Sequence, residues 1–196
     1  MTALHATKSA HVTPPGADTR PRGFARLRGA YSWRTSAYAL AAPTVGLAAL
    51  PLLLAGRSVG YRWQRRLAVR LLDAEIPEAS GRGRIVHGTA HSVAALPLQI
   101  LSGVLAGVFW ALFLARGVCY PLAEWGNDVS GSWGGPTMAG AWAAHFGVGL
   151  LTGAVLLPLV ALLVAAQRRL AVRLLGGGTA AAATASPAAA RGGRAG

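Results

Sequence analysis

Two histidines four residues apart, His87 and His91, are the residues of this sequence whose types and spacing come closest to a metal site. On a helix this spacing places both rings on one face. A zinc site needs at least a third protein ligand, and the glycines around the pair weaken the expectation of a regular helix. We therefore interpret the pair as polar residues at the inner end of an apolar segment, and expect neither a metal nor a cofactor. The nearest acids in sequence are Asp73, Glu75 and Glu78.

Serine chemistry is the second possibility. Ser130 and Ser132 have His145 as the one base in their part of the chain. A hydrolase also needs a third group that orients the base, and the sequence offers none in a suitable pattern. His145 is better interpreted as an interfacial residue at the boundary of an apolar run. With no phosphate-binding loop or metal cluster in view, the sequence predicts a protein that is not an enzyme.

The most specific pattern in the chain is a repeat. The nine residues QRRLAVRLL occur at 64–72 and again at 167–175, and each copy follows an apolar run. On a helix, Trp63, Leu67 and Leu71 share one face, as do Leu170 and Leu174 of the second copy. The arginines form another face, so each copy is predicted to be an amphipathic basic helix at a membrane surface. The candidate membrane-surface or partner-binding residues are Arg62, Arg65, Arg66, Arg70, Arg168, Arg169 and Arg173.

Two roles for the repeat remain open. As a topology anchor, each copy would place its apolar face at the headgroup boundary and its arginines against anionic lipid. As a lever, it would pass a change across the membrane to a partner protein. Both roles are compatible with the pattern of residues.

Composition indicates the setting of these elements. Apolar residues make up 53% of the chain and charged residues 13%, with a formal net charge of +13. A nucleic-acid reader would need its basic residues on a folded polar surface, whereas here they cluster at the ends of apolar runs. We therefore expect a lipid bilayer, and no nucleic acid, as the environment of the chain. The single cysteine, Cys119, allows no internal disulfide.

Three uncharged runs, at residues 36–56, 92–115 and 146–166, have the length of membrane spans. The predicted fold is an all-α integral membrane protein with three hydrophobic segments and two amphipathic basic cytoplasmic helices, at residues 57–72 and 167–175. The membrane domain covers 31–176. The segments 1–30 and 177–196 lack apolar periodicity and are predicted to be disordered.

Arginine asymmetry predicts the orientation. Seven arginines lie within residues 57–91 and the segment after Ala166 begins with Arg168, Arg169 and Arg173, whereas residues 117–145 contain no lysine or arginine. A multi-pass protein of the cell membrane is expected, with 57–91 and 167–196 cytoplasmic and 117–145 outside.

The first run conflicts with this orientation, because five arginines precede an end that should lie outside. Either the run dips into the membrane and returns, broken at Pro43 or Pro51, or the violation is real. A cleaved signal peptide would contradict the basic segment that follows. The five arginines are Arg20, Arg22, Arg26, Arg28 and Arg34.

The outer connection is the candidate sensing surface, although an aromatic belt at the interface is the ordinary explanation of its tryptophans. Two Gly-x-x-x-Gly pairs are predicted to pack the helical hairpin against itself or against a second copy. Gln99 is expected to form a hydrogen bond across a helix interface. The candidate sensing residues are Glu124, Trp125, Asp128 and Trp133, and the packing glycines are Gly103, Gly107, Gly149 and Gly153.

Three stretches carry a resemblance to a known family: LPLLLAGRSVGYRWQRRLAVRLLDAEIP (50–77), HSVAALPLQILSGVLAGVFWALF (91–113) and LLPLVALLVAAQRRLAVRLLG (156–176). Together they resemble the sensor domain of actinobacterial membrane proteins, a domain that often precedes a histidine kinase module. The resemblance covers roughly residues 36–176 and implies two tandem pairs of spans. This chain departs from that plan, because its first half is short by one span.

The resemblance implies a function. It is a non-enzymatic membrane sensor or signalling-accessory module, which couples an envelope or lipid signal to a cytoplasmic kinase or regulator. A structural or transport-accessory membrane subunit is the alternative, and a homo-oligomer is compatible with either role.

Overall fold

The computed structural model describes residues 32–176, and over this range the chain forms helices and no strand. The predicted all-α class is confirmed. The terminal segments 1–30 and 177–196 lie outside the described residues, together with the expectation of disorder for them and four of the five N-terminal arginines.

The helices are α2 (Trp33–Leu54), α3 (Val59–Leu72), α4 (Gly83–Leu112), the short α5 (Tyr120–Ala123) and α6 (Met138–Leu175). A π-helical segment, η1 (Phe113–Val118), extends α4 without interruption. Three of these units are long and apolar enough to cross a membrane: Trp33–Leu54, Gly83–Val118 and Met138–Leu175. The prediction of three apolar membrane segments is confirmed.

The two copies of the repeat are built differently. The first forms a helix of its own, α3, whereas the second is the last part of α6, a single helix of 38 residues. Nothing interrupts α6 after Ala166, because that stretch contains no glycine or proline to stop it. The helix predicted at 167–175 is therefore the C-terminal end of a much longer one.

The first apolar run is also continuous, because α2 passes through both Pro43 and Pro51. Of the two alternatives left open for this run, a break of the helix at Pro43 or Pro51 is not what the structure has. Prolines are tolerated in membrane helices when neighbouring groups compensate for the lost hydrogen bond. The chain turns back only after Leu54, at residues 55–58, where Gly56 has a φ of 75° that glycine adopts without strain.

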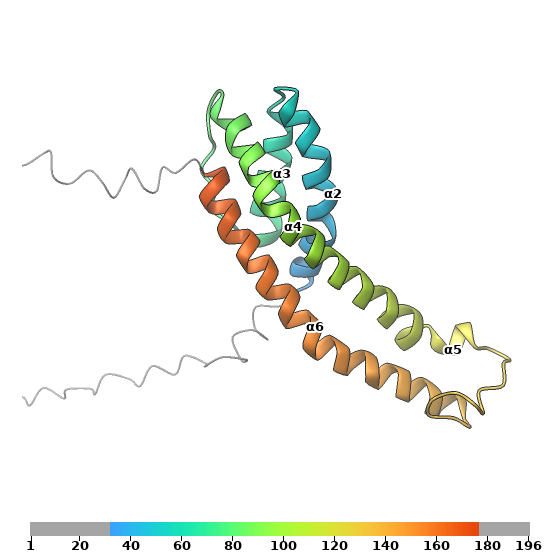
Figure 1. Cartoon of the computed structure of the whole chain (residues 1–196). Coiled ribbons are helices and arrows are strands. Elements are labelled where there is room, and N and C mark those ends of the chain that lie inside the picture. The colour runs from blue at the N-terminus through green and yellow to red at the C-terminus, as the bar shows by residue number, and fades with distance from the viewer. Residues whose placement is uncertain (1–31, 177–196) are drawn as a thin grey trace, which may run out of the picture.

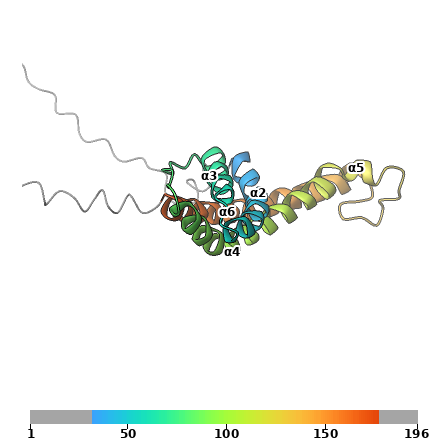
Figure 2. The ribbon, with the colours of Figure 1, turned by 90° about the horizontal axis from the view of Figure 1, so that it is seen from above.

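The helices form a bundle with an arm. The hairpin of α2 and α3 packs beside the first part of α4 and the last part of α6 (Figure 1). Beyond the bundle, the end of α4 and the start of α6 continue together as a two-helix arm that carries α5 and the connection to α6 (Figures 1 and 2). The arm and the bundle therefore share two continuous helices.

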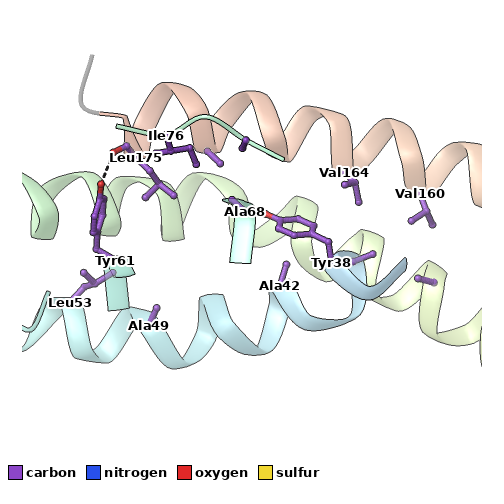
Figure 3. Close-up of a cluster of buried hydrophobic side chains, with 14 residues drawn as sticks. Tyr38, Ala42, Ala49, Leu53, Tyr61, Ala68, Ile76, Val160, Val164 and Leu175 are labelled. Carbon is purple, nitrogen blue, oxygen red and sulfur yellow. Dashed lines mark hydrogen bonds between the residues drawn. The ribbon is translucent and has the colours of Figure 1, made fainter. Parts of the chain in front are cut away.

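Small residues bring the helices of the bundle together. Alanines and a few larger side chains, including Tyr38, Leu53 and Tyr61, form the core (Figure 3). A Cβ on Gly60 of α3 would lie 2.7 Å from the carbonyl oxygen of Ala49. Backbones at this spacing exclude any side chain larger than hydrogen, as in other membrane helix pairs.

The two Gly-x-x-x-Gly pairs contact different partners. A Cβ on Gly103 would lie 2.7 Å from Cγ of Pro43, so this glycine faces α2, not α6. Gly107 lies beside Leu40, also on α2. On α6, a Cβ on Gly149 or Gly153 would meet the ring of Phe113 or Phe109, respectively. The pairs therefore accommodate two separate contacts of α4, one with α2 and one within the α4–α6 hairpin.

Gly103 and Gly107 offer a matched test of the α2–α4 contact. A Cβ on Gly103 would also lie 3.0 Å from the backbone oxygen of Ala39, whereas on Gly107 the nearest atom is 3.7 Å away. We expect Gly103→Ala to destabilise the protein by about 1–3 kcal/mol, as overpacking does. Gly107→Ala should be neutral or slightly stabilising, since alanine favours helix. Thermal unfolding in detergent measures both variants, and equal stability of the two would contradict the close contact at Gly103.

Candidate functional site

The two copies of the repeat bury the same face. In the first copy Gln64 and Ala68 are buried, and in the second their counterparts Gln167 and Ala171 are buried. Trp63 of the predicted apolar face is 42% exposed, and Leu67 and Leu71 are only half-buried. The side of α3 that packs against the rest of the protein is therefore a glutamine–alanine stripe, and the face of Trp63, Leu67 and Leu71 stays partly exposed.

Gln64 connects α3 to α4. Its amide Nε2 donates to Oγ of Ser92 at 2.5 Å, and its Oε1 lies 2.7 Å from Nδ1 of His91. Because an amide oxygen only accepts, the proton between these two side chains belongs to Nδ1 of His91. His91 and Ser92 are both 1% exposed, so this small network is closed to solvent.

Gln167 makes an equivalent contact with a serine further along α4. Its Nε2 donates to Oγ of Ser102 at 2.9 Å and to the carbonyl oxygen of Leu98 at 3.1 Å. Ser92 and Ser102 are ten positions apart, about 15 Å along the helix at 1.5 Å per residue. The glutamine of each copy thus donates a hydrogen bond to one serine of α4, so both copies pack against α4.

A polar seam therefore runs along the buried face of α4, formed by His91, Ser92, Gln99 and Ser102. Gln99 lies against α2, where Gly46 has no Cβ to obstruct its Oε1. Among the described residues, three buried atoms of this region have no hydrogen-bond partner: Nε2 of His91, Oε1 of Gln99 and Oε1 of Gln167. Polar groups inside apolar helices are costly, which is why they mark sites of function or of specific helix pairing.

The first arginine of each copy binds the linker that follows α3. Nε of Arg65 donates to the carbonyl oxygen of Ile76 at 2.9 Å. Its counterpart Arg168 donates to the carbonyl oxygens of Leu72 and Asp73, at 3.1 and 3.3 Å. Equivalent arginines from the two copies thus bind the backbone of residues 72–76. Arg65 and Arg168 therefore have a structural role.

A further arginine connects the start of α2 to the same segment. Arg34 forms an ion pair with Asp73, with NH1 of the guanidinium 2.6 Å from Oδ2, and also donates to the carbonyl oxygen of Arg70. The first residues of α2 and the last residues of α3 are therefore directly bonded.

The remaining candidate arginines, on α3 and at the end of α6, face outward. Within residues 32–176 their side chains are exposed and form no hydrogen bond or ion pair, so their charges are available to lipid or to another protein. Of the seven candidate arginines, this outward set comprises Arg62, Arg66, Arg70, Arg169 and Arg173.

The candidate sensing loop has a local structure. Glu124 accepts a hydrogen bond from Nδ2 of Asn127 at 2.9 Å. Asp128 accepts from the backbone N–H and from the hydroxyl of Ser130, and these bonds lower the pKa of Asp128 below its usual value. Trp125 and Trp133 are 82% and 71% exposed. The two carboxylates are thus occupied by neighbours in the loop, whereas the two indole rings are open to the surroundings.

Gln167 and Ser102 allow the polar seam to be tested. Gln167→Met should destabilise the protein by about 1–3 kcal/mol, because it leaves a buried serine hydroxyl without this partner. In the double variant with Ser102→Ala the loss should be smaller than the sum of the single losses, by about 0.6 kcal/mol, the mean for membrane helices. Denaturant unfolding in detergent measures this difference. Strict additivity would show that the two side chains are not coupled.

Comparison of the chain with models of known protein families finds no match, and comparisons with curated proteins and with solved structures find none either.

Proposed function

We propose that this protein is a non-enzymatic membrane sensor or signalling-accessory module that couples an envelope or lipid signal to a cytoplasmic partner. The observation that carries the proposal is the continuity of two helical units. The α4–η1 unit has 36 residues and α6 has 38, so at 1.5 Å per residue each is more than about 50 Å long. This exceeds the bilayer with its headgroups, about 40–45 Å thick.

These two units connect the loop at the end of the arm to the basic repeat without a hinge of loop residues. A displacement of the loop helices would reach the far end as a displacement of the last turns of α6. The contacts of Gln64 and Gln167 with α4 would pass it on to α3. Both copies of the repeat would then move together, and with them the outward arginines.

The outward arginines are the proposed output surface. Their guanidinium groups can bind carboxylates in a planar, two-point geometry that lysine cannot reproduce. An acidic surface of a kinase or regulator is the partner that fits this chemistry. The same charges would also hold the repeat at an anionic membrane surface.

A relation to the sensor domain family of actinobacterial membrane proteins is part of the proposal. What supports it is the order of the elements: an apolar helix, a basic helix, a linker, and an apolar hairpin that ends in the same basic sequence.

The proposed topology differs from three simple crossings. Arg34 is paired with Asp73, so the start of α2 and the linker after α3 must lie on one side of the membrane. That linker belongs to the arginine-rich segment, which places it in the cytoplasm. We therefore place both ends of the α2–α3 hairpin on the cytoplasmic side, with α4 and α6 as the crossing helices. The N-terminal arginines then obey the positive-inside rule.

Labelling in intact cells tests this topology. With Cys119 replaced by serine, a cysteine at Ser130 should react with a membrane-impermeant thiol reagent, and a cysteine at Ser80 should not. A tag at Thr2 should be protected in intact cells and become accessible after lysis. Accessibility of that tag before lysis would show that α2 crosses the membrane as a span of its own.

Arginine-to-lysine variants test the output surface. Replacing Arg62, Arg66, Arg70, Arg169 and Arg173 together by lysine preserves every charge, so topology should be unchanged. Recovery of the cytoplasmic partner by crosslinking from native membranes should fall roughly tenfold, because the two-point contacts are lost. The matched control replaces Arg57 and Arg82, which are exposed but lie outside the repeat.

Three outcomes are informative. Loss of a kinase or regulator from the repeat variant alone supports the proposal. Equal recovery from both variants would contradict docking through this surface. Recovery of transporter components in place of signalling proteins would favour a transport-accessory subunit.

A further inference from the structure

A groove runs along the two-helix arm, between the end of α4–η1 and the start of α6, with a volume of about 340 Å³. Val108 and Leu112 line one wall, and Val148 and Leu156 line the other. Arg116, His145 and Trp133 lie at the end of the groove next to the connection between α5 and α6. The groove is therefore apolar along its length and polar at its outer end.

The aromatic packing of the arm forms the back of this groove. Cδ2 of Phe113 lies 2.6 Å from the position a Cβ on Gly149 would take, and Phe109 occupies the corresponding notch at Gly153, with a 2.9 Å approach. The two phenylalanine rings are stacked with centroids 5.6 Å apart. They hold the helices together behind the groove and leave its open side to the surrounding membrane.

The π-helical segment positions Arg116. The N–H of Cys119 donates to the carbonyl oxygen of Leu114 at 2.7 Å, a bond over five residues in place of four. The carbonyl oxygen of Gly117 accepts a hydrogen bond from Nε1 of Trp142 at 2.7 Å. Trp142 thus connects η1 to α6, and this contact fixes the backbone next to Arg116.

The guanidinium of Arg116 has no counter-charge in the part of the chain that the structure describes. Among residues 32–176 its side chain forms no hydrogen bond or ion pair. The two acids of the nearby loop, Glu124 and Asp128, are bonded to Asn127 and Ser130. A cation at the edge of the hydrocarbon region requires an anionic partner or access to the headgroups. Phosphate is the anion that membranes offer at this depth.

The dimensions of the groove suit a lipid. From His145 to Leu156 it follows eleven residues of α6, about 16 Å at 1.5 Å per residue. One leaflet of the hydrocarbon core is about 15 Å thick, half of the 30 Å total. An acyl chain that starts at the headgroup level would thus end near the inner end of the groove.

We propose that this groove binds one glycerophospholipid of the outer leaflet, with the lipid phosphate on Arg116 and one acyl chain between the walls of α4 and α6. The assignment to the outer leaflet rests on the proposed topology, whereas the binding itself does not depend on the signalling proposal, because it concerns the purified chain alone. If both hold, the lipid occupies the arm whose helices lead to the basic repeat.

Native mass spectrometry of the full-length protein, with dioleoyl phosphatidylglycerol added in detergent, measures retained lipid directly. The unmodified protein should retain one molecule, and inorganic phosphate should not displace it. Dioleoylglycerol, which has the same chains and no phosphate, should be retained about tenfold less. Arg116→Gln should lower retention of the phospholipid by about the same factor, since a charge-assisted contact is lost. Arg116→Lys should retain part of it.

A second variant tests the acyl-chain part of the groove. Thr152 lines the groove, so Thr152→Trp should fill it and reduce retention while Arg116 remains. The matched control is Leu151→Trp on the same helix, at a residue that is 72% exposed and does not line the groove. This control should retain lipid like the unmodified protein. Thermal unfolding in detergent confirms that the variants are folded.

Two results would overturn the proposal. One is phospholipid retention unchanged by both Arg116→Gln and Thr152→Trp. The other is a change of oligomeric state in Thr152→Trp without any change in lipid, which would show that a second copy of the chain covers the groove.

Discussion

The fold depends on how α4 satisfies its polar side chains inside an apolar segment. His91, Ser92 and Ser102 are buried on one face of this helix, where water cannot serve as their partner. The partners are Gln64 and Gln167, the same residue of a nine-residue sequence used twice. Because each contact requires its helix to lie against α4 at one height, the two glutamines determine where α3 and the end of α6 must pack.

The rest of each repeat follows from this placement. Once Gln64 and Gln167 face α4, the next residue of each copy, Arg65 or Arg168, is directed at the linker after α3, and both bind backbone carbonyls there. Arg66 and Arg169, one position further, are directed outward. Three consecutive residues of each copy thus have three roles. The glutamine contacts α4, the first arginine contacts the linker, and the second arginine leaves its charge exposed. The proposed separation of structural arginines from partner-binding arginines rests on this order.

Sequence reasoning was sufficient for the fold class and for the three apolar helices, because run length and the absence of charge determine them. It did not identify the face of the repeat that packs against α4, because it considered only the leucine and arginine faces. In a bilayer, leucine gains little by leaving lipid, whereas glutamine and alanine gain by packing against another helix. The spacing of Gln64 and Ala68 was a visible signal. The groove beside Arg116 could not be predicted, since it needs side chains from 108–116 and 145–156, far apart in the chain, to meet.

The π-helical segment η1 has a consequence for the phase of the arm. A helix advances about 100° per residue, so a residue added to a regular α-helix would turn everything after it. In η1 the wider turn closed by Leu114 and Cys119 absorbs the extra residue instead. Deleting a single residue there would restore α-helical bonding and leave the following residues facing nearly the same way. Related chains that differ by one residue at this position would therefore share the bundle and still present the same side of the arm beyond it.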